Sequence, residues 1–162
     1  MDIETQVRAA LREIPHELIE CDPELADTAA FCAHYGYPPE QSANTIVVAS
    51  RKPEGHHAAC LVLATHRLDV NKRVRGLLGV RKVSFAPADL TAEITGMMIG
   101  GVTPFALPPK LPLWIDEAVM ECPWVIIGGG SRSLKVKLAP EHLAHLPNAA
   151  VVESLANPIA PH

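Results

Sequence analysis

Two strand-forming segments joined by a short polar link restrict the folds open to this chain more than any other feature. Residues 45–49 are β-branched or small, and residues 58–65 are almost wholly apolar. β-branched residues favour strands, and a strand that is apolar on both faces belongs in the centre of a sheet. The link over residues 51–57 is polar and contains a glycine, so the two strands are predicted to form an antiparallel hairpin.

Helix signals flank this hairpin. Apolar residues recur on one face over residues 3–14, which predicts an amphipathic helix. A second helix is predicted between a capping Asp22 and a terminating Gly36. A third is predicted, for the same reasons, between Asp69 and Gly79. Shorter helices are predicted over residues 87–94 and from Pro140 onward.

Further short strands are predicted at residues 81–86, 113–115, 124–127 and 134–138. In the last of these, Lys135 and Lys137 alternate with apolar residues, which predicts that both lysines point to solvent. The chain shows no internal repeat and no linker that would divide it. Helices followed by strands with hairpin-length links predict an α+β fold, with a mixed, mostly antiparallel sheet curled into a barrel and flanked by helices.

A single domain is expected to cover residues 1–153. Residues 1–20 are assigned to an N-terminal helical segment, and the proline-rich residues 154–162 to a frayed tail. An apolar share of 48% in 162 residues excludes bulk disorder, and no apolar run approaches the roughly 20 residues that span a bilayer. Because residues 1–13 alternate charges too often for a signal peptide, a cytoplasmic protein is expected.

Cysteine and glycine patterns give no indication of a cofactor. The four cysteines lack a CxxC pair, and no histidine pair has a suitable cysteine or carboxylate set beside it, so free thiols and no metal are expected. The three glycines at 128–130 follow a predicted strand but lack the GxGxxG spacing, which excludes a dinucleotide site.

Charge is distributed unevenly along the chain. Residues 1–41 carry nine acidic side chains against two basic ones, whereas residues 51–82 carry eight basic side chains against two acidic ones. The basic stretch predicts either a phosphate-binding surface or a solvated helix face without a partner. Charge alone leaves both interpretations open.

The segment over residues 95–105 is the clearest candidate for chemistry. It holds three glycines in six residues and then a proline, a composition unfavourable to a regular element. Such a loop allows backbone to approach a ligand, so Gly100 and Gly101 could offer N–H groups to a carbonyl or oxyanion, with Thr103 adding a hydroxyl. A tight turn between packed elements is the alternative interpretation.

Four segments, in order along residues 20–150, together resemble the YbaK/EbsC-type prolyl-tRNA-editing domain family. They are the helix–strand unit from Thr28-Ala-Ala to Thr45-Ile-Val-Val, the segment His66-Arg-Leu-Asp-Val-Asn-Lys, the loop from Thr95-Gly to Gly-Gly-Val-Thr-Pro-Phe105, and Ile115-Asp-Glu followed by Ile127-Gly-Gly-Gly-Ser-Arg-Ser-Leu. The resemblance implies a YbaK-like fold and a single-domain hydrolase that deacylates mischarged aminoacyl-tRNA in trans, without a cofactor.

In that family the glycine loop holds the aminoacyl carbonyl by backbone N–H groups, and the substrate's terminal ribose hydroxyl orients the attacking water. This fits a chain without an evident Ser-His-Asp or Cys-His arrangement. The resemblance implies the acceptor end of an aminoacyl-tRNA carrying a small amino acid, such as a mischarged tRNA-Pro, as partner, with a synthetase as a further partner and no membrane or DNA. The basic residues expected to bind tRNA are Lys72, Arg73 and Arg75.

The resemblance also implies site residues. Those expected to be catalytic are Gly100, Gly101, Asn44 and Thr103. Those expected to bind substrate are Thr45, Phe31, His66, Pro104, Phe105, Asp116 and Gly130. For three of these the residues alone leave a second interpretation open, because Phe31 could be core, His66 a surface histidine and Asp116 a helix cap.

One departure from the family pattern concerns charge. Where the family has lysine in a K-T-L/I motif, this chain has Asn44 before Thr45 and Ile46, and asparagine carries no charge. Either the substrate sits differently, or another cation such as Lys72 or Lys110 substitutes, or the chemistry is lost. The rival hypothesis is therefore a non-catalytic module that binds an amino acid, a nucleotide or a tRNA end.

Overall fold

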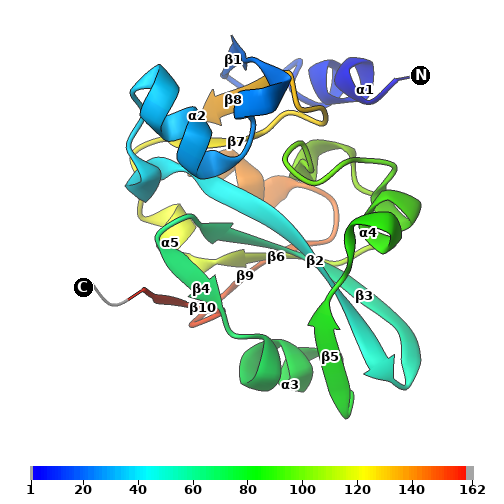
Figure 1. Cartoon of the computed structure of the whole chain (residues 1–162). Helices are drawn as coiled ribbons and strands as arrows, with labels where there is room; N and C mark the ends of the chain where they lie inside the picture. The colour runs from blue at the N-terminus through cyan, green and yellow to red at the C-terminus, as the bar shows by residue number, and fades with distance from the viewer. Residues whose placement is uncertain (1, 160–162) are drawn as a thin grey trace.

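The computed structural model describes residues 2–159, and its largest element is a five-stranded sheet in the order β5-β2-β3-β6-β9 (Figure 1). The strands are β2 (Ala43–Lys52), β3 (Glu54–Leu63), β5 (Lys82–Phe85), β6 (Leu113–Asp116) and β9 (Ala149–Val152). The β2–β3 pair is antiparallel, which confirms the predicted hairpin. β3–β6 and β6–β9 are parallel, so the sheet is mixed.

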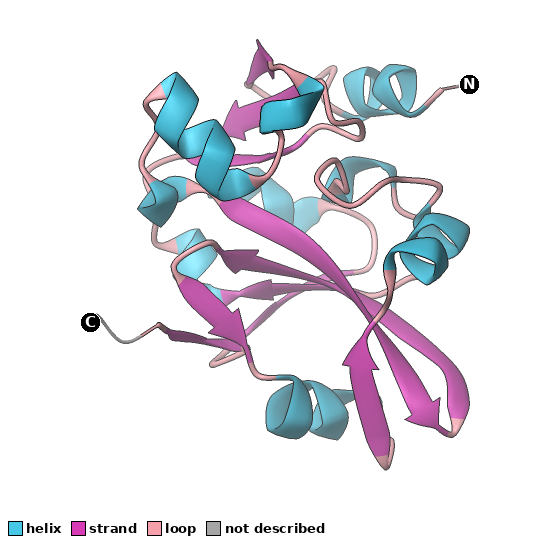
Figure 2. Cartoon of the chain, viewed as in Figure 1, coloured by secondary structure: helices cyan, strands magenta, loops and turns pink. Residues whose placement is uncertain are grey.

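Two smaller sheets complete the fold. One has the antiparallel order β1-β8-β7, formed by β1 (Glu17–Glu20), β8 (Leu134–Leu138) and β7 (Val125–Gly128). The other pairs β10 (Ala156–Pro158) with β4 (His66–Leu68). Within the described residues the sheets stay separate and close no barrel, so the barrel expectation is wrong while the α+β fold class is confirmed (Figure 2).

The predicted helices form, with changes at their ends. α1 (Ile3–Ala10) is shorter than predicted, and the remainder of the segment 1–20 contains strand β1, so residues 1–20 are not helical throughout. α4 (Ala88–Thr95) ends at Gly96, whose φ of 75° is the left-handed conformation that glycine adopts readily. α5 (Glu117–Met120) directly follows β6.

The helix predicted between Asp22 and Gly36 is divided in two. Asp22 caps a 3₁₀ turn over Pro23–Leu25, and α2 (Thr28–Tyr35) begins only after Asp27. The interruption leaves the carbonyl of Ala26 and the carboxylate of Asp27 outside the helix, where both bind other parts of the chain.

The Asp69-capped segment is irregular as well. Asp69 accepts a hydrogen bond from the Lys72 N–H, a π-helical turn follows over Val70–Val74, and α3 (Arg75–Leu78) ends at Gly79. The segment predicted from Pro140 is a 3₁₀ helix over Pro140–His145.

The hydrophobic core covers both faces of the five-stranded sheet. Leu61 and Ile115 belong to a cluster on one face, and Cys60 and Val62 to a cluster on the other. β3 is therefore apolar on both sides because both sides are covered. All four cysteines are free thiols, and burial raises the pKa of the Cys60 thiol to about 12.

The C-terminal segment is structured, contrary to the predicted frayed tail. Ala156–Pro158 form β10, and the Ala156 N–H donates to Oδ1 of Asp116 at 3.2 Å. Leu155 is fully buried in the cluster around Cys60 and Val62. Residues 160–162 of the predicted tail lie outside the described residues. The tail is held because its leucine fills the core and its backbone extends β4.

Replacing Leu155 by alanine is expected to destabilise the protein by about 2–4 kcal/mol, since the substitution leaves a cavity in a covered core. Urea unfolding followed by circular dichroism measures the loss. Ile159→Ala is the matched control, because Ile159 is 46% exposed and its truncation should change stability by less than about 0.5 kcal/mol. Equal stability of Leu155→Ala and wild type would mean that the C-terminal segment is frayed, as the sequence predicted.

Candidate functional site

A cavity of about 460 Å³ lies where the start of α2, the first half of β2, the glycine loop and β8 meet. We refer to residues 96–103 as the glycine loop. The cavity walls include Asp27 and Thr28, residues 43–47 of β2, Gly100 of the glycine loop, and Lys135 of β8. Phe85 at the end of β5 is 53% exposed and borders the same cavity.

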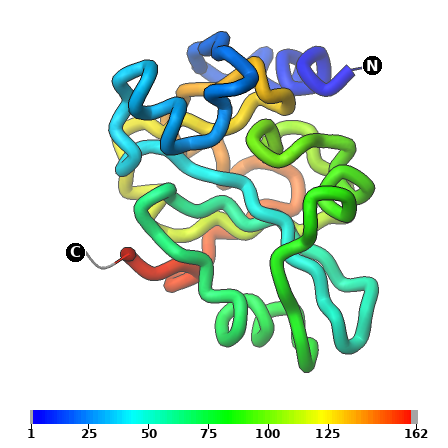
Figure 3. The backbone as a smooth tube through the Cα atoms, viewed as in Figure 1, coloured from blue at the N-terminus to red at the C-terminus, as the bar shows by residue number. Residues whose placement is uncertain are grey.

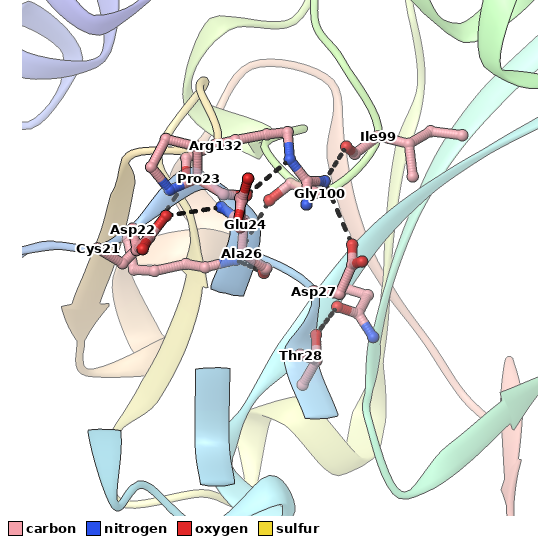
Figure 4. Close-up of polar contacts among 12 residues, drawn as sticks. Cys21, Asp22, Pro23, Glu24, Ala26, Asp27, Thr28, Ile99, Gly100 and Arg132 are labelled. Atoms are coloured by element: carbon pink, nitrogen blue, oxygen red, sulfur yellow. Dashed lines mark hydrogen bonds and ion pairs between the residues drawn. The ribbon is translucent and has the colours of Figure 1, made fainter. Parts of the chain in front are cut away.

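Arg132 connects the segments around this cavity (Figure 4). Its Nε donates to the carbonyl of Pro23 at 3.0 Å, and its Nη1 donates to the carbonyl of Ile99 at 2.9 Å. Nη1 also pairs with Oδ1 of Asp27 at 3.3 Å. One guanidinium therefore joins the 3₁₀ turn, the start of α2 and the glycine loop, a use of the rigid fork that lysine could not reproduce. Arg132 lies within a segment of the family resemblance, but the sequence analysis assigned it no role.

The prediction that Lys135 points to solvent is wrong. Its side chain is buried, with the residue only 6% exposed, because β8 is the middle strand of its sheet and its inner face meets α2 and the glycine loop. Nζ donates to the carbonyls of Ala26 at 2.6 Å and Gly100 at 3.2 Å. It also lies 5.4 Å from the centre of the Phe31 ring, a cation–π distance. Burial lowers the pKa of this ammonium.

Asn44 and Thr45 present polar groups on the β2 side of the cavity. Asn44 Oδ1 accepts a hydrogen bond from the Thr28 hydroxyl at 2.5 Å, and its amide nitrogen makes no hydrogen bond within residues 2–159. The Thr45 hydroxyl is buried without a partner among the described residues. Both groups remain able to bind a ligand. Lys72 and Lys110 do not line the cavity, so the cation inside it is Lys135.

Of the predicted catalytic residues in the glycine loop, Gly100 lines the cavity, whereas Gly101 and Thr103 do not. Gly100 lines the cavity with a φ of 97°, and an added Cβ there would meet the Arg132 guanidinium. Gly101 instead donates its N–H to Met98 at 2.9 Å and accepts from the Gly130 N–H at 2.7 Å. Thr103 is fully buried and its hydroxyl accepts from the Phe105 N–H. Three residues of the loop line the cavity, namely Ile99, Gly100 and Val102, and the N–H group of each makes no hydrogen bond within residues 2–159.

A small annex adjoins the cavity. It has a volume of about 10 Å³ and lies against Phe31, Ser42, Ile126 and Ile127. Four residues border both spaces, namely Thr28, Ala43, Gly128 and Lys135. Phe31 is buried and stacks on Tyr37 with ring centres 5.6 Å apart, so it forms the wall of the annex and also belongs to the core.

The other predicted site residues lie outside the cavity. Pro104 and Phe105 are buried in the 3₁₀ turn after the glycine loop, and Gly130 packs against Ile3 of α1. His66 lies in β4, and its Nδ1 is 3.2 Å from the Thr65 hydroxyl. Asp116 lies beneath the C-terminal segment.

The predicted tRNA-binding residues lie on the α3 side of the molecule. Lys72, Arg73 and Arg75 fall in the π-helical turn and α3, and Arg73 Nε donates to the Glu153 carbonyl at 3.0 Å. A second hollow, lined by Arg67 and Asn71, shares Phe85 with the cavity. Arg67 therefore lines a hollow that meets the cavity at Phe85, whereas Lys72, Arg73 and Arg75 line neither space.

Two further findings concern residues 2–159 as a whole. No group of three or more histidine, cysteine, aspartate or glutamate side chains is placed to hold a metal ion. None of the helices in this part of the chain is long and apolar enough to cross a membrane.

Comparison with known sequences gives one family and two curated relatives. The model of a family described as "Aminoacyl-tRNA editing domain" matches residues 22–146. YwhH of Bacillus subtilis is 30% identical over 113 residues, which make up 65% of this chain and 71% of YwhH. A protein of Enterococcus faecalis named "Putative Cys-tRNA(Pro)/Cys-tRNA(Cys) deacylase EbsC" is 25% identical over 93 residues, 57% of this chain and 56% of EbsC.

Solved structures share the fold over nearly the full length. The crystal structure of "hypothetical protein APE2540" aligns with a TM-score of 0.81 and 25% identity, covering 96% of this chain and 99% of that one. The structure of "a putative trans-editing enzyme for prolyl tRNA synthetase" aligns with a TM-score of 0.78 and 24% identity, covering 94% and 96%. These alignments confirm the predicted fold class.

Proposed function

The chain belongs to the aminoacyl-tRNA editing domain family, and from this premise we propose that it is a trans-acting aminoacyl-tRNA deacylase. The substrate is a tRNA that carries a small, mischarged amino acid, and the reaction is hydrolysis of the ester that joins them. The observation that carries the proposal is the cavity at the glycine loop, whose lining combines loop residues with unpartnered backbone N–H groups, Asn44 and Thr45 of β2, and Lys135.

The chemistry of this cavity is positioning and charge stabilisation. The N–H of Gly100, supported by that of Val102, binds the ester carbonyl and the negative charge that develops on its oxygen. This replaces the pair Gly100 and Gly101 expected from the sequence, because the Gly101 N–H already binds Met98. Asn44 and Thr45 hold the terminal ribose, whose hydroxyl orients the attacking water, so that no side-chain nucleophile is required.

The size of the annex supports a small amino acid. A space of about 10 Å³ holds roughly one non-hydrogen atom, since a single water needs about that volume. A side chain of one carbon, with or without one further atom, fits the annex and its entrance. Larger side chains would have to displace Phe31 or Ile126, both of which are buried.

The acceptor stem approaches from the basic side. Lys72, Arg73 and Arg75 guide the phosphates, and Phe85 at the mouth of the cavity offers a face on which the terminal base stacks. The name of EbsC and the description of the trans-editing structure point to tRNA-Pro as a substrate and to prolyl-tRNA synthetase as a partner. These assignments, and a location in the cytoplasm, are part of the proposal.

A panel of mischarged tRNAs tests the proposal. Alanine, cysteine, serine and threonine esters on several tRNAs are offered to wild type and to Asn44→Lys, and release of the amino acid is followed. Turnover of one pair by wild type is expected, because Lys135 already places a cation in the cavity. Turnover by Asn44→Lys alone would favour the non-catalytic binding module, in which the chemistry was lost with the family lysine.

A further inference from the structure

Lys135 stands at the junction between the cavity and the annex. It borders both spaces, together with Thr28, Ala43 and Gly128. The annex is too small for more than the end of a side chain. A group that reaches the annex from the cavity therefore lies beside Lys135.

The Lys135 ammonium has a donor to spare. An ammonium group carries three N–H donors, and two of them bind the carbonyls of Ala26 and Gly100. Neither partner is charged, and the nearby carboxylate of Asp27 is paired with Arg132. Among residues 2–159, Lys135 has no ion-pair partner within 4.0 Å. The Phe31 ring lies 5.4 Å from Nζ, and among residues 2–159 no oxygen or nitrogen accepts the third N–H, so a ligand that supplies such an acceptor stabilises this buried cation.

The other polar groups of the annex are engaged. The Thr28 hydroxyl donates to Asn44, and the Ser42 hydroxyl lies 3.5 Å from the Pro38 carbonyl and 3.3 Å from the Cys32 sulfur. The remaining annex walls include Phe31, Ile126 and Ile127, which are apolar. The spare donor of Lys135 is thus the group in the annex wall best able to distinguish one small side chain from another.

We propose that Lys135 is a specificity-determining residue, whose ammonium hydrogen-bonds the hydroxyl oxygen of a seryl group and thereby favours a seryl over an alanyl ester. The inference rests on the proposed function and deepens it. A serine side chain places one oxygen beyond its β-carbon, which matches the room in the annex. An alanine side chain fits as well but leaves the donor unpaired, and a site built to bind a hydroxyl discriminates strongly against the analogue without it.

Non-hydrolysable analogues test the inference without requiring turnover. Adenosine derivatives in which a 3′-amide carries a seryl, an alanyl or an aspartyl group are titrated into the full-length protein by calorimetry. Wild type is expected to bind the seryl analogue about 10- to 100-fold more tightly than the alanyl analogue, the range of one hydrogen bond to a charged group. Lys135→Met is expected to bind both equally, near the wild-type affinity for the alanyl analogue.

Lys137→Met is the matched control, because Lys137 lies on the same strand but outside the cavity. Its Nζ is 4.0 Å from Glu17 and 4.4 Å from the centre of the Trp124 ring. This variant should keep the seryl preference of wild type. A loss of the preference in Lys137→Met would overturn the inference, since removal of any β8 lysine would then have the same effect.

Other results would overturn the inference as well. For wild type, these results are equal binding of the seryl and alanyl analogues, tighter binding of the aspartyl analogue than of the seryl analogue, and no binding of any analogue. For Lys135→Met, the result is an equal loss of affinity for the seryl and alanyl analogues, which would make the lysine merely structural. If Lys135→Met does not fold, the wild-type preference decides alone. Failure of the proposed function gives a different result: wild type would still bind the seryl analogue more tightly than the alanyl analogue but would hydrolyse no aminoacyl-tRNA.

Discussion

Gly101→Ala is expected to lose at least about 100-fold in the rate of deacylation, the scale on which displaced backbone donors reduce catalysis. An added Cβ would lie 2.5 Å from the Ser131 carbonyl carbon and 2.7 Å from its oxygen, and backbone atoms of a packed loop cannot yield as a side-chain end can. The Gly101 carbonyl also accepts a hydrogen bond from the Gly130 N–H. A displacement of Gly101 would therefore shift the segment around Gly130 as well as the glycine loop, and would move Gly100 at the cavity. Single-turnover hydrolysis measures the effect.

Folding must be measured beside activity for this variant, because overpacking also destabilises, by about 1–3 kcal/mol. Gly76→Ala is the matched control: Gly76 lies in α3, and nothing within 4 Å would meet its Cβ. The control should keep full activity and unchanged or slightly raised stability. Gly101→Ala with wild-type hydrolysis would show that the glycine loop tolerates a shift and does not set the position of the carbonyl.

Arg132→Met is the second change with a large expected effect, a loss of about 10- to 100-fold in kcat/KM. The substitution keeps an unbranched apolar stem but removes the donors to Pro23 and Ile99 and the pairing with Asp27. The glycine loop is then no longer joined to the start of α2, and misplacement of a positioning group by about 1 Å can cost 100-fold in rate. Steady-state hydrolysis and urea unfolding measure the two consequences.

The arginine prediction has two comparisons within the chain. Arg12→Met removes an exposed guanidinium from the N-terminal segment and should leave hydrolysis unchanged. Arg132→Lys keeps the charge but lacks the fork, so it should recover only part of the activity. Full recovery by lysine would mean that charge at this position matters and that the three-way connection does not.

Local signals in the sequence were sufficient for the hairpin and for the glycine loop. The apolar run that predicted a central strand is β3, whose two faces pack into separate clusters. Gly36 and Gly79 end their helices in the left-handed conformation that was the reason for choosing them. In each case the residues that decide the structure are neighbours in sequence, so their pattern can be interpreted without knowledge of the fold.

The prediction for Lys135 was wrong because the residues that cover its side chain, Ala26 and Gly100, are distant in sequence. Alternation correctly identified β8, but it says only which residues share a face, and assigning the polar face to solvent assumes that this face is uncovered. Ala26, which accepts from the Lys135 ammonium, lies more than a hundred positions earlier in the chain. For the same reason the sequence did not identify Lys135 as the cation that lines the cavity beside Asn44.

The short strands β1, β9 and β10 were missed for a related reason. Each has three or four residues, too few to establish a period. β10 contains a proline, which usually argues against a strand, but it lies at an edge and pairs only with β4. The strand partners, β8, β6 and β4, supply the order that these segments lack by themselves.

The pairing of β1 with β8 has a consequence for biosynthesis. Residues 17–20 leave the ribosome before residues 134–137, so this sheet closes only after more than a hundred further residues have been synthesised. Arg132 lies just before β8 and Lys135 lies within it, so until this segment is made the cavity has neither its connecting guanidinium nor its ammonium. A nascent chain that has not yet reached β8 therefore has no complete cavity.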